Sequence, residues 1–299
     1  GYAFPFFCRK NRMNRIQQIF NATWAIERKD YLNLISIIQP SIKAGNFADL
    51  EKLLSRDQTS IQAANLSNLA KAWDFYDENL PENSIGVITL NGMLYNWESE
   101  RIALYLEEAL LNSKIAGVVF KINGVGGMVS GLNEITDIIA KAGKPVVSVI
   151  TGCCFSAHYW LASATRRRFL IDTASQVGSV GVVGTYYNAT ESMKKEGIDF
   201  REIYPDTADL KNREYRDIAE KNDEKAFKAH LQKVHALFCE AVSKGLSIPY
   251  NKELPLFRGA MFMGDEAIQA GMADGYGNVA DAARWILAQQ MIEQTKDIV

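Results

Sequence analysis

Ser156 is the residue whose chemistry depends most on its place in this sequence, because it stands at the start of a predicted helix. Residues 154–162 read Cys-Phe-Ser-Ala-His-Tyr-Trp-Leu-Ala, with small side chains at 156 and 157. A serine at a helix start commonly caps the helix by accepting a backbone N–H hydrogen bond. The same position lets the first N–H groups of the helix stabilise an oxyanion on a substrate that the hydroxyl attacks. Position alone leaves a helix cap and a nucleophile as alternatives.

Two glycine-containing segments flank this serine in the sequence. Gly124-Val125-Gly126-Gly127 directly follows a predicted strand, and glycines allow positive φ and a close backbone approach to a ligand oxygen. No Gly-Lys-Ser/Thr follows and the spacing is not G-x-G-x-x-G, so the segment is not a known phosphate-binding loop. A tight turn is its other interpretation. Gly178-Ser179-Val180-Gly181-Val182 begins another predicted strand, where Ser179 is either a turn hydroxyl or part of a site.

The general base for such a serine is not an obvious histidine. His230 and His235 lie on a long predicted helix, and His158 is two residues past the serine on another side of its helix. A Ser-His-Asp triad needs a histidine supplied from elsewhere. A lysine can replace it if desolvation keeps the amine neutral near pH 7, because its ordinary pKa is about 10.4. Lys211, in a polar loop, is a candidate, although most loop lysines are solvated charges.

These segments follow the strands of an alternating α/β pattern. Short β-branched runs predict strands at 85–90, 116–122 and 145–150, with helices over 98–111 and up to residue 140 between them. Further strands are expected near 169–171, 180–183 and 200–204, and further helices over 222–244, 265–270 and 280–294. The alternation favours a mainly parallel sheet, whose ligand sites lie beyond the carboxyl ends of its strands.

The first quarter of the chain carries no catalytic motif, and we expect it to be a helical accessory arm. The apolar residues that recur at roughly helical spacing, up to an interruption at Pro40, are Trp24, Ile26, Tyr31, Leu34, Ile35 and Ile38. Residues 47–54 form a second amphipathic stretch, and residues 58–68 look like a linker or a solvated helix. The pattern changes at Pro81, which predicts an arm over 1–80 and a catalytic domain over 81–299.

Composition narrows the functional classes. Lys plus Arg total 33 against 35 Asp plus Glu in 299 residues, so no global field attracts nucleic acid. No apolar run reaches the ~18 to 20 residues of a membrane helix, and the N-terminal apolar stretch precedes its basic residues, the wrong order for a signal peptide. The four cysteines form no C-x-x-C pair, which argues against zinc or a disulfide framework. We expect a cytoplasmic protein without a membrane anchor.

Taken together, the segments resemble the signal peptide peptidase A-type serine peptidases, which share the Clp-protease/crotonase fold. Ile122-Asn123-Gly124-Val125-Gly126-Gly127 resembles the family's I-N-S-P-G-G, and residues 155–162 resemble its nucleophile block A-S-G-G-Y-Y-I-A. Residues 178–182 resemble its G-S-I-G-V, and residues 259–274 resemble its closing segment. The resemblance extends over about residues 84 to 290. It implies a repeated β-β-α superhelix with a mainly parallel sheet.

The resemblance also implies a serine endopeptidase with a Ser-Lys dyad and no metal or organic cofactor. It assigns Ser156 as the nucleophile, points to Lys211 as the base, and makes Ser179 an auxiliary that holds the amine in line. Lys211 would be buried beside the serine in the active assembly. The flanking lysines that remain alternative bases are Lys194, Lys195 and Lys221.

The same resemblance places the oxyanion hole in the backbone. The N–H of Gly126 or Gly127, with that of Ala157, would bind the tetrahedral oxyanion, and an extended substrate would add as a strand beside the glycines. Two departures from the family pattern stand here. Gly124-Val125 replaces Ser-Pro, and Ala157-His158 replaces two glycines, where the bulk of His158 could narrow the site.

Within that family the chain resembles the phage head proteins that act as capsid maturation proteases. The residues that carry this likeness are Ala22-Thr23-Trp24-Ala25-Ile26 and Tyr31-Leu32. It implies a protein substrate such as a capsid or scaffold protein, a homo-oligomer, and a location in the host cytoplasm, the prohead or the virion. Two other functions stay open: a catalytically inactive head scaffold or adaptor of the same fold, and a crotonase-like enzyme that acts on acyl-thioesters.

Overall fold

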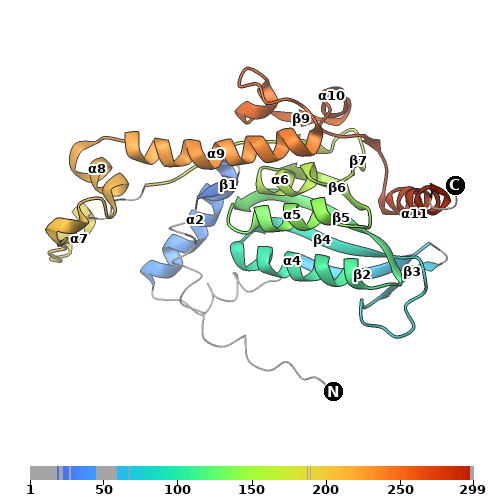
Figure 1. Cartoon of the computed structure of the whole chain (residues 1–299). Coiled ribbons are helices and arrows are strands. Elements are labelled where there is room, and N and C mark those ends of the chain that lie inside the picture. The colour runs from blue at the N-terminus through green and yellow to red at the C-terminus, as the bar shows by residue number, and fades with distance from the viewer. Residues whose placement is uncertain are drawn as a thin grey trace.

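The computed structural model describes residues 19, 23–26, 28–44, 59–66, 68–186, 188 and 190–296. Its centre is a sheet with the strand order β10-β7-β6-β5-β4-β2-β3, in which β1 also pairs with β5, and β8 pairs with β6 and β9 (Figure 1). The strands are β1 Trp24–Ile26, β2 Thr59–Asn65, β3 Asn68–Trp73, β4 Ser84–Leu94, β5 Ile115–Met128, β6 Val146–Phe155, β7 Arg167–Leu170, β8 Gln176–Gly178, β9 Met261–Met263 and β10 Gly275–Tyr276.

The α/β alternation predicted from the sequence is confirmed. Strands β4, β5, β6, β7 and β10 pair in parallel, as do β6 and β8, whereas β1, β2, β3 and β9 pair antiparallel to their neighbours. The helices are α2 Arg28–Lys43, α4 Asn96–Leu111, α5 Leu132–Lys141, α6 Ala157–Ser163, α7 Thr190–Lys195, α8 Arg213–Lys221, α9 Lys225–Leu246, α10 Gly264–Gln269 and α11 Val279–Lys296, with short 3-10 turns η1 Asp206–Ala208 and η2 Pro255–Arg258.

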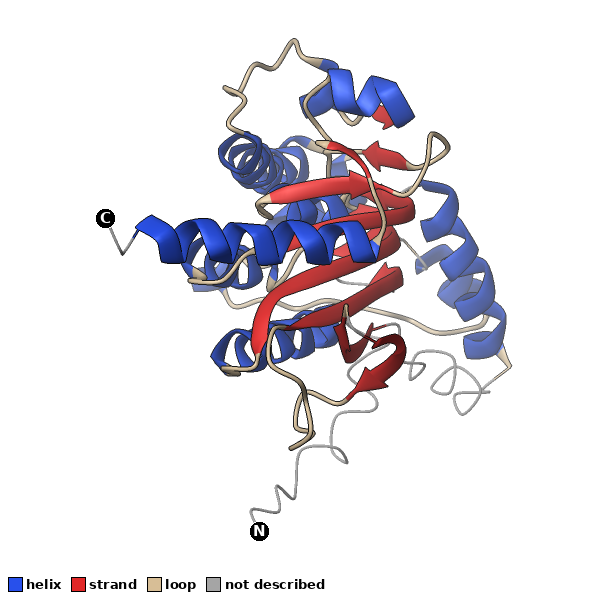
Figure 2. Ribbon diagram, turned by 90° about the vertical axis from the view of Figure 1, so that its right-hand side faces the viewer, coloured by secondary structure: helices blue, strands red, loops and turns tan. Residues whose placement is uncertain are grey.

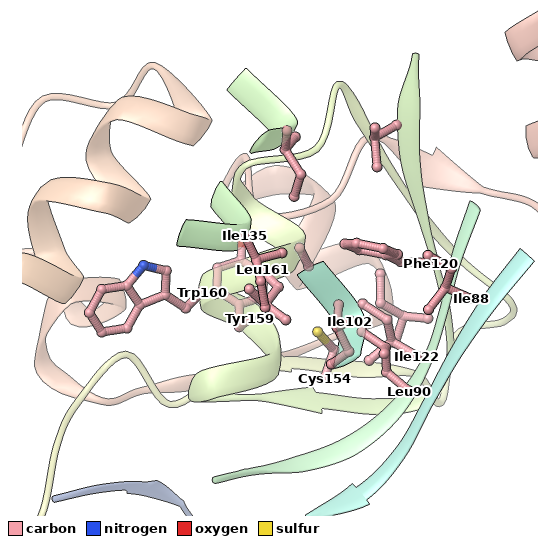
Figure 3. Close-up of a cluster of buried hydrophobic side chains, with 14 of the residues drawn as sticks. Ile88, Leu90, Ile102, Phe120, Ile122, Ile135, Cys154, Tyr159, Trp160 and Leu161 are labelled. Carbon is pink, nitrogen blue, oxygen red and sulfur yellow. The ribbon is translucent and has the colours of Figure 1, made fainter. Parts of the chain in front are cut away.

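Helices cover both faces of the sheet because successive strand side chains point to opposite sides. On one face, Ile88, Phe120 and Ile122 pack in the main core with residues of α4, α5, α6 and α9 (Figure 3). On the other face, Val119 and its neighbours pack against Ile286 of α11, the helix that crosses the sheet in Figure 2. The first of these layers matters for function, because α6 is the helix that follows Ser156.

The predicted helical character of residues 1–80 is correct only for α2 among the parts that the structure describes. Residues 59–73 are the strands β2 and β3 rather than a linker or solvated helix, because the open edge of β4 supplies backbone partners that local polarity does not reveal. Trp24–Ile26 is a strand, and α2 runs through Pro40 to Lys43. Residues 47–54 lie outside the described residues. The division at residue 80 stays a prediction.

Two smaller strand predictions are wrong. Residues 180–183 form no strand beyond an isolated bridge at Val183, because β8 ends at Gly178 and Ser179 has a φ of 55°. Residues 200–204 are an exposed segment without a ladder partner among the described residues, and Ile203 is 91% exposed. Apolar side chains in that segment therefore serve a surface rather than a buried strand.

Candidate active site

Ser156 is the single residue that joins strand β6 to helix α6. Its backbone angles are φ 55° and ψ −117°, a conformation that costs a non-glycine residue about 1 to 3 kcal/mol. Such strain persists only where the surroundings impose it, and it is characteristic of serines held on a sharp strand-to-helix turn for nucleophilic attack. No feature of the sequence predicted this backbone conformation. The backbone conformation of Ser156 therefore differs from that of an ordinary loop serine.

The hydrogen bonds of Ser156 exclude the helix-cap interpretation. Its side chain makes no capping bond to α6; the hydroxyl donates instead to the Gly181 carbonyl oxygen at 3.2 Å. Its backbone N–H donates to the Gly178 carbonyl at 2.8 Å, and its carbonyl accepts from the Trp160 N–H at 2.8 Å. These backbone contacts fix the turn and leave the hydroxyl as the group with freedom to change partner.

The glycine segment lies directly beside the serine, and of its two interpretations the tight turn is not what the structure shows. Strand β5 continues through it to Met128, with Gly126 at φ 104°. A Cβ built on Gly126 would come within 3.0 Å of Ser156 Cβ, so only glycine allows the two backbones this approach. The β5–β6 ladder ends at the pair Gly124 and Cys154, where β6 turns away toward the serine. That divergence frees one edge of β5 at residues 126–128.

His158 contacts the glycine segment in a way that the sequence did not predict. The residue is 1% exposed, and its Nδ1 accepts the backbone N–H of Gly126 at 3.1 Å. Burial lowers the pKa of His158 from 6.5 to about 4, so the imidazole is neutral at pH 7 and can act as this acceptor. A Cβ on Gly124 would overlap the same ring. Gly124, where the family has serine, therefore makes room for His158, where the family has glycine. This combination of a smaller residue at 124 with a larger one at 158 was the signal in the sequence.

The proposed oxyanion donors are thus only partly available in this state. The Gly126 N–H is engaged by His158, and Gly127 lies in ladders with both Leu94 and Ala25. Ala157 is the first residue of α6, and its N–H has no acceptor within the helix. The Ala157 N–H is accordingly the predicted donor best disposed to meet a developing oxyanion.

Ser179 lies next to this group, whereas Lys211 does not. Gly178 is paired with Phe155, so Ser179 follows a residue held against the turn at Ser156, and its own N–H donates to the Ala260 carbonyl at 2.9 Å. Lys211 is exposed in the turn between η1 and α8. Figure 1 shows α8 beyond the edge of the sheet, at the start of α9. The single chain does not bury this lysine, and its pairing with the serine stays a prediction.

A cavity of about 430 Å³ lies beside Gly181, the residue that accepts the serine hydroxyl. One lysine, Lys228, lines it, but the carboxylate of Glu224 binds the Lys228 amine at 2.7 Å and raises its pKa. That shift disfavours the neutral amine that a base requires. The other lining residues are Val180, Gly181, Val182, Leu231, Gln232, His235 and Arg258.

The described residues contain no group of three or more His, Cys, Asp or Glu side chains able to hold a metal ion. Within the same part of the chain, no helix is both long and apolar enough to cross a membrane.

In a comparison with protein families, the model of peptidase family S49 matches residues 138–293, about half of the chain. The matched region contains the strand β6, the serine turn, the Gly178-Ser179 segment and Lys211.

Individual relatives include proteases and phage head proteins. Protease 4 of Haemophilus influenzae is 25% identical over 229 residues, which cover 73% of this chain and 36% of that protein. Capsid assembly protease C of Escherichia phage lambda is 30% identical over 181 residues, 59% of this chain and 40% of that protein. Head-tail preconnector protein GP5 of Enterobacteria phage P21 is 28% identical over 186 residues, 60% and 36% respectively. The chain matches less than half of each relative's length.

Proposed function

The chain belongs to peptidase family S49, and from this membership we propose that it is a serine endopeptidase in which Ser156 is the nucleophile and Lys211 the general base. The observation that carries the proposal is the strained turn at Ser156, whose hydroxyl does not cap the helix that it precedes. A strained backbone at this point presents a hydroxyl at the start of a helix, which is the position a nucleophile needs for attack.

The proposed reaction forms a bond between Ser156 Oγ and the scissile carbonyl carbon while Lys211 Nζ takes the hydroxyl proton. The C–N bond then breaks, and the leaving amine receives that proton. Water attacks the acyl-enzyme with the lysine again as base, which releases the carboxylic acid and restores the serine. The Ala157 N–H would stabilise the oxyanion, joined by Gly126 once its N–H leaves His158. Removing one such donor typically costs ~10²- to 10³-fold in rate.

A lysine serves as base only when desolvation lowers its pKa from about 10.4 toward neutrality. Lys211 is exposed here, and several apolar side chains of the same segment are exposed with it: Ile198 50%, Phe200 54%, Ile203 91% and Leu210 66%. We define residues 198–211 as the lysine segment. A second copy of the chain that covers this segment would bury both the apolar side chains and the amine. The proposal therefore includes a homo-oligomer in which Lys211 of one copy serves Ser156 of a neighbour.

The substrate proposed is a head protein of a phage, because two relatives are named as a capsid assembly protease and a head-tail preconnector protein. Co-expression of the chain with its capsid or scaffold protein should give discrete cleavage products. Ser156→Ala should abolish them, and the exposed variant Ser192→Ala should retain them. Cleavage that survives Ser156→Ala would disprove the assignment of the nucleophile.

One observation favours a non-catalytic scaffold or adaptor as the second candidate: Ser156 is only 1% exposed. A serine-reactive phosphonate distinguishes the two functions. If the phosphonate labels the wild type and Ser156→Ala abolishes that labelling, the protein is an enzyme. If the phosphonate labels no variant that retains Ser156, the protein is a scaffold.

A further inference from the structure

Strand β1 lies between two segments of the body and bonds to both. On one side it pairs antiparallel with the edge of β5 that β6 leaves free. On the other side, the Trp24 N–H donates to the Val183 carbonyl at 3.0 Å, and the Val183 N–H donates to the Trp24 carbonyl at 2.7 Å. Both edges of β1 are therefore used, and no other peptide can add to β5 at this position while β1 is there.

The direction of β1 is that of a substrate. Its register pairs Trp24 with Met128, Ala25 with Gly127, and Ile26 with Gly126, so the strand advances toward the glycine that touches Ser156. A Cβ on Gly126 would meet both the Ala25 carbonyl oxygen and Ser156 Cβ, which puts this carbonyl and the serine on either side of one point. The acyl part of a substrate precedes its scissile bond, and β1 approaches the nucleophile from that side.

The aromatic anchor of β1 is a small cluster that contains Trp24 and Ile26, whereas Ala25 packs in the main core. Trp24 is fully buried there, with Tyr31 edge-on at 5.7 Å and Tyr95 at 6.2 Å between ring centroids. The hydroxyls of Tyr31 and Thr185 share a hydrogen bond of 2.7 Å, which ties α2 to the same wall as Val183. Ala25 is the one residue of β1 in the main core, so withdrawal of β1 and α2 would remove a single small side chain from the core that holds the serine turn.

We infer that β1 is an internal pseudosubstrate: it fills the peptide channel between β5 and Val183, and proteolysis requires that it withdraw. The channel binds an extended peptide as the middle strand of three, with main-chain bonds to both walls. The inference rests on the proposed function for the purpose of the channel. Its occupancy by β1 also accounts for the burial of Ser156, which a substrate must reach.

Peptide binding tests the channel without any need for catalysis. The probe is a fluorescein-labelled peptide with the sequence Ala-Thr-Trp-Ala-Ile-Glu, residues 22–27 of this chain, measured by fluorescence anisotropy in full-length protein. Ser156→Ala provides the inactive background, and Trp24→Ala loosens β1. While β1 occupies the channel, only the fraction of chains in which it has withdrawn can bind the peptide, and the apparent affinity for the peptide is reduced by that fraction. We expect the double variant to bind the peptide at least about tenfold more tightly than Ser156→Ala alone.

Leu32→Ala is the matched control, because Leu32 lies on α2 but is 49% exposed. It should bind the peptide as weakly as its parent. Should Trp24→Ala lose its cooperative thermal transition, Tyr31→Phe serves as the second variant, since it removes only the hydroxyl bond to Thr185. If a folded variant that loosens β1 binds the peptide no more tightly than Ser156→Ala alone, the inference is overturned.

Labelling by the phosphonate separates this inference from the proposed function. With Ser156 intact, Trp24→Ala should react at least about tenfold faster than the wild type. If the loosened variant binds the peptide but its serine never reacts, the proposed function fails and the channel stands. If wild type and Trp24→Ala react equally fast and bind the peptide equally, the pseudosubstrate fails and the nucleophile stands.

Discussion

The serine turn and the lysine segment are built in opposite ways. Ser156 is 1% exposed, and backbone bonds to Gly178 and Trp160 hold its strained conformation. Lys211 lies in an exposed turn, and the nearby Ile203 is 91% exposed. The fold of one chain thus completes the nucleophile but leaves its proposed base in solvent. On the proposed assignment, folding alone would prepare the nucleophile, whereas the base would become functional only on assembly.

Subunit mixing is the largest test of this difference. Ser156→Ala and Lys211→Ala should each be inactive alone, because one lacks the nucleophile and the other the base. When the two are unfolded together and refolded, some neighbours combine an intact serine with an intact lysine, and random mixing should restore roughly a quarter of the wild-type cleavage rate. Cleavage of the co-purified head protein measures it. No recovery in mixed oligomers, verified by two affinity tags, would contradict a dyad shared between copies.

The buried histidine makes the serine region sensitive to acid. His158 has a pKa of about 4 in the folded protein against an ordinary 6.5. Between pH 6.5 and pH 4 its imidazole therefore binds a proton in the unfolded chain but not in the folded one. Its contribution to stability is complete above pH 6.5, falls by about 3 kcal/mol as the pH drops to 4, and levels off below. Denaturant unfolding of wild type and His158→Gln should show that only the wild type has this loss.

The control for this pH dependence is His230→Gln, on the exposed side of α9, which should keep the wild-type slope. Identical slopes for wild type and His158→Gln would show that His158 does not stay neutral in the fold.

The fit between Gly124 and His158 gives a smaller effect within the serine region. Gly124→Ser, which restores the family residue, should cost about 1 to 3 kcal/mol of unfolding free energy, because its Cβ overlaps the imidazole. Adding His158→Gly should return part of that loss, so the two changes should couple by about 1 kcal/mol in a double-mutant cycle. Additive unfolding energies would mean that the two departures from the family pattern are independent.

The lysine segment should be nearly silent in the stability of one chain. Ile203→Ser should change the unfolding free energy by less than about 0.5 kcal/mol, because the side chain is exposed. It should nevertheless weaken self-association, measured by sedimentation velocity, if a second copy covers it. Leu111→Ser, at an 84% exposed position at the end of α4, is the matched change and should leave association intact. Equal association of both variants would remove the lysine segment from the interface.

Short-range sequence patterns correctly predicted those strands of the sheet whose side chains are buried. The β-branched runs at 85–90, 116–122 and 145–150 are the strands β4, β5 and β6, because buried parallel strands need such side chains whatever surrounds them. Ser156 and its glycine neighbours were also found from motif and spacing. The strained angles of the serine, and its hydroxyl bond to Gly181, follow from long-range packing that no motif records.

The misses share one cause, which is a partner distant in the sequence. Trp24–Ile26 has the spacing of the helix that follows it, yet it is a strand because β5 and Val183 both offer it backbone bonds. From the sequence, His158 was expected to narrow the site, but the absence of a side chain at Gly124, on strand β5, leaves space for the imidazole ring. The apolar residues at 200–204 suggested a strand, and in one chain they find no sheet to join.

A structure of the assembled chain with a peptidyl phosphonate bound tests the proposed dyad most directly. We expect a covalent bond from phosphorus to Ser156 Oγ and a Lys211 amine of a neighbouring copy within about 3 Å of that oxygen. We also expect the peptide to occupy the place of β1. An adduct on Ser156 with Lys211 in solvent, or with Lys194, Lys195 or Lys221 beside the serine, would contradict the assignment of the base.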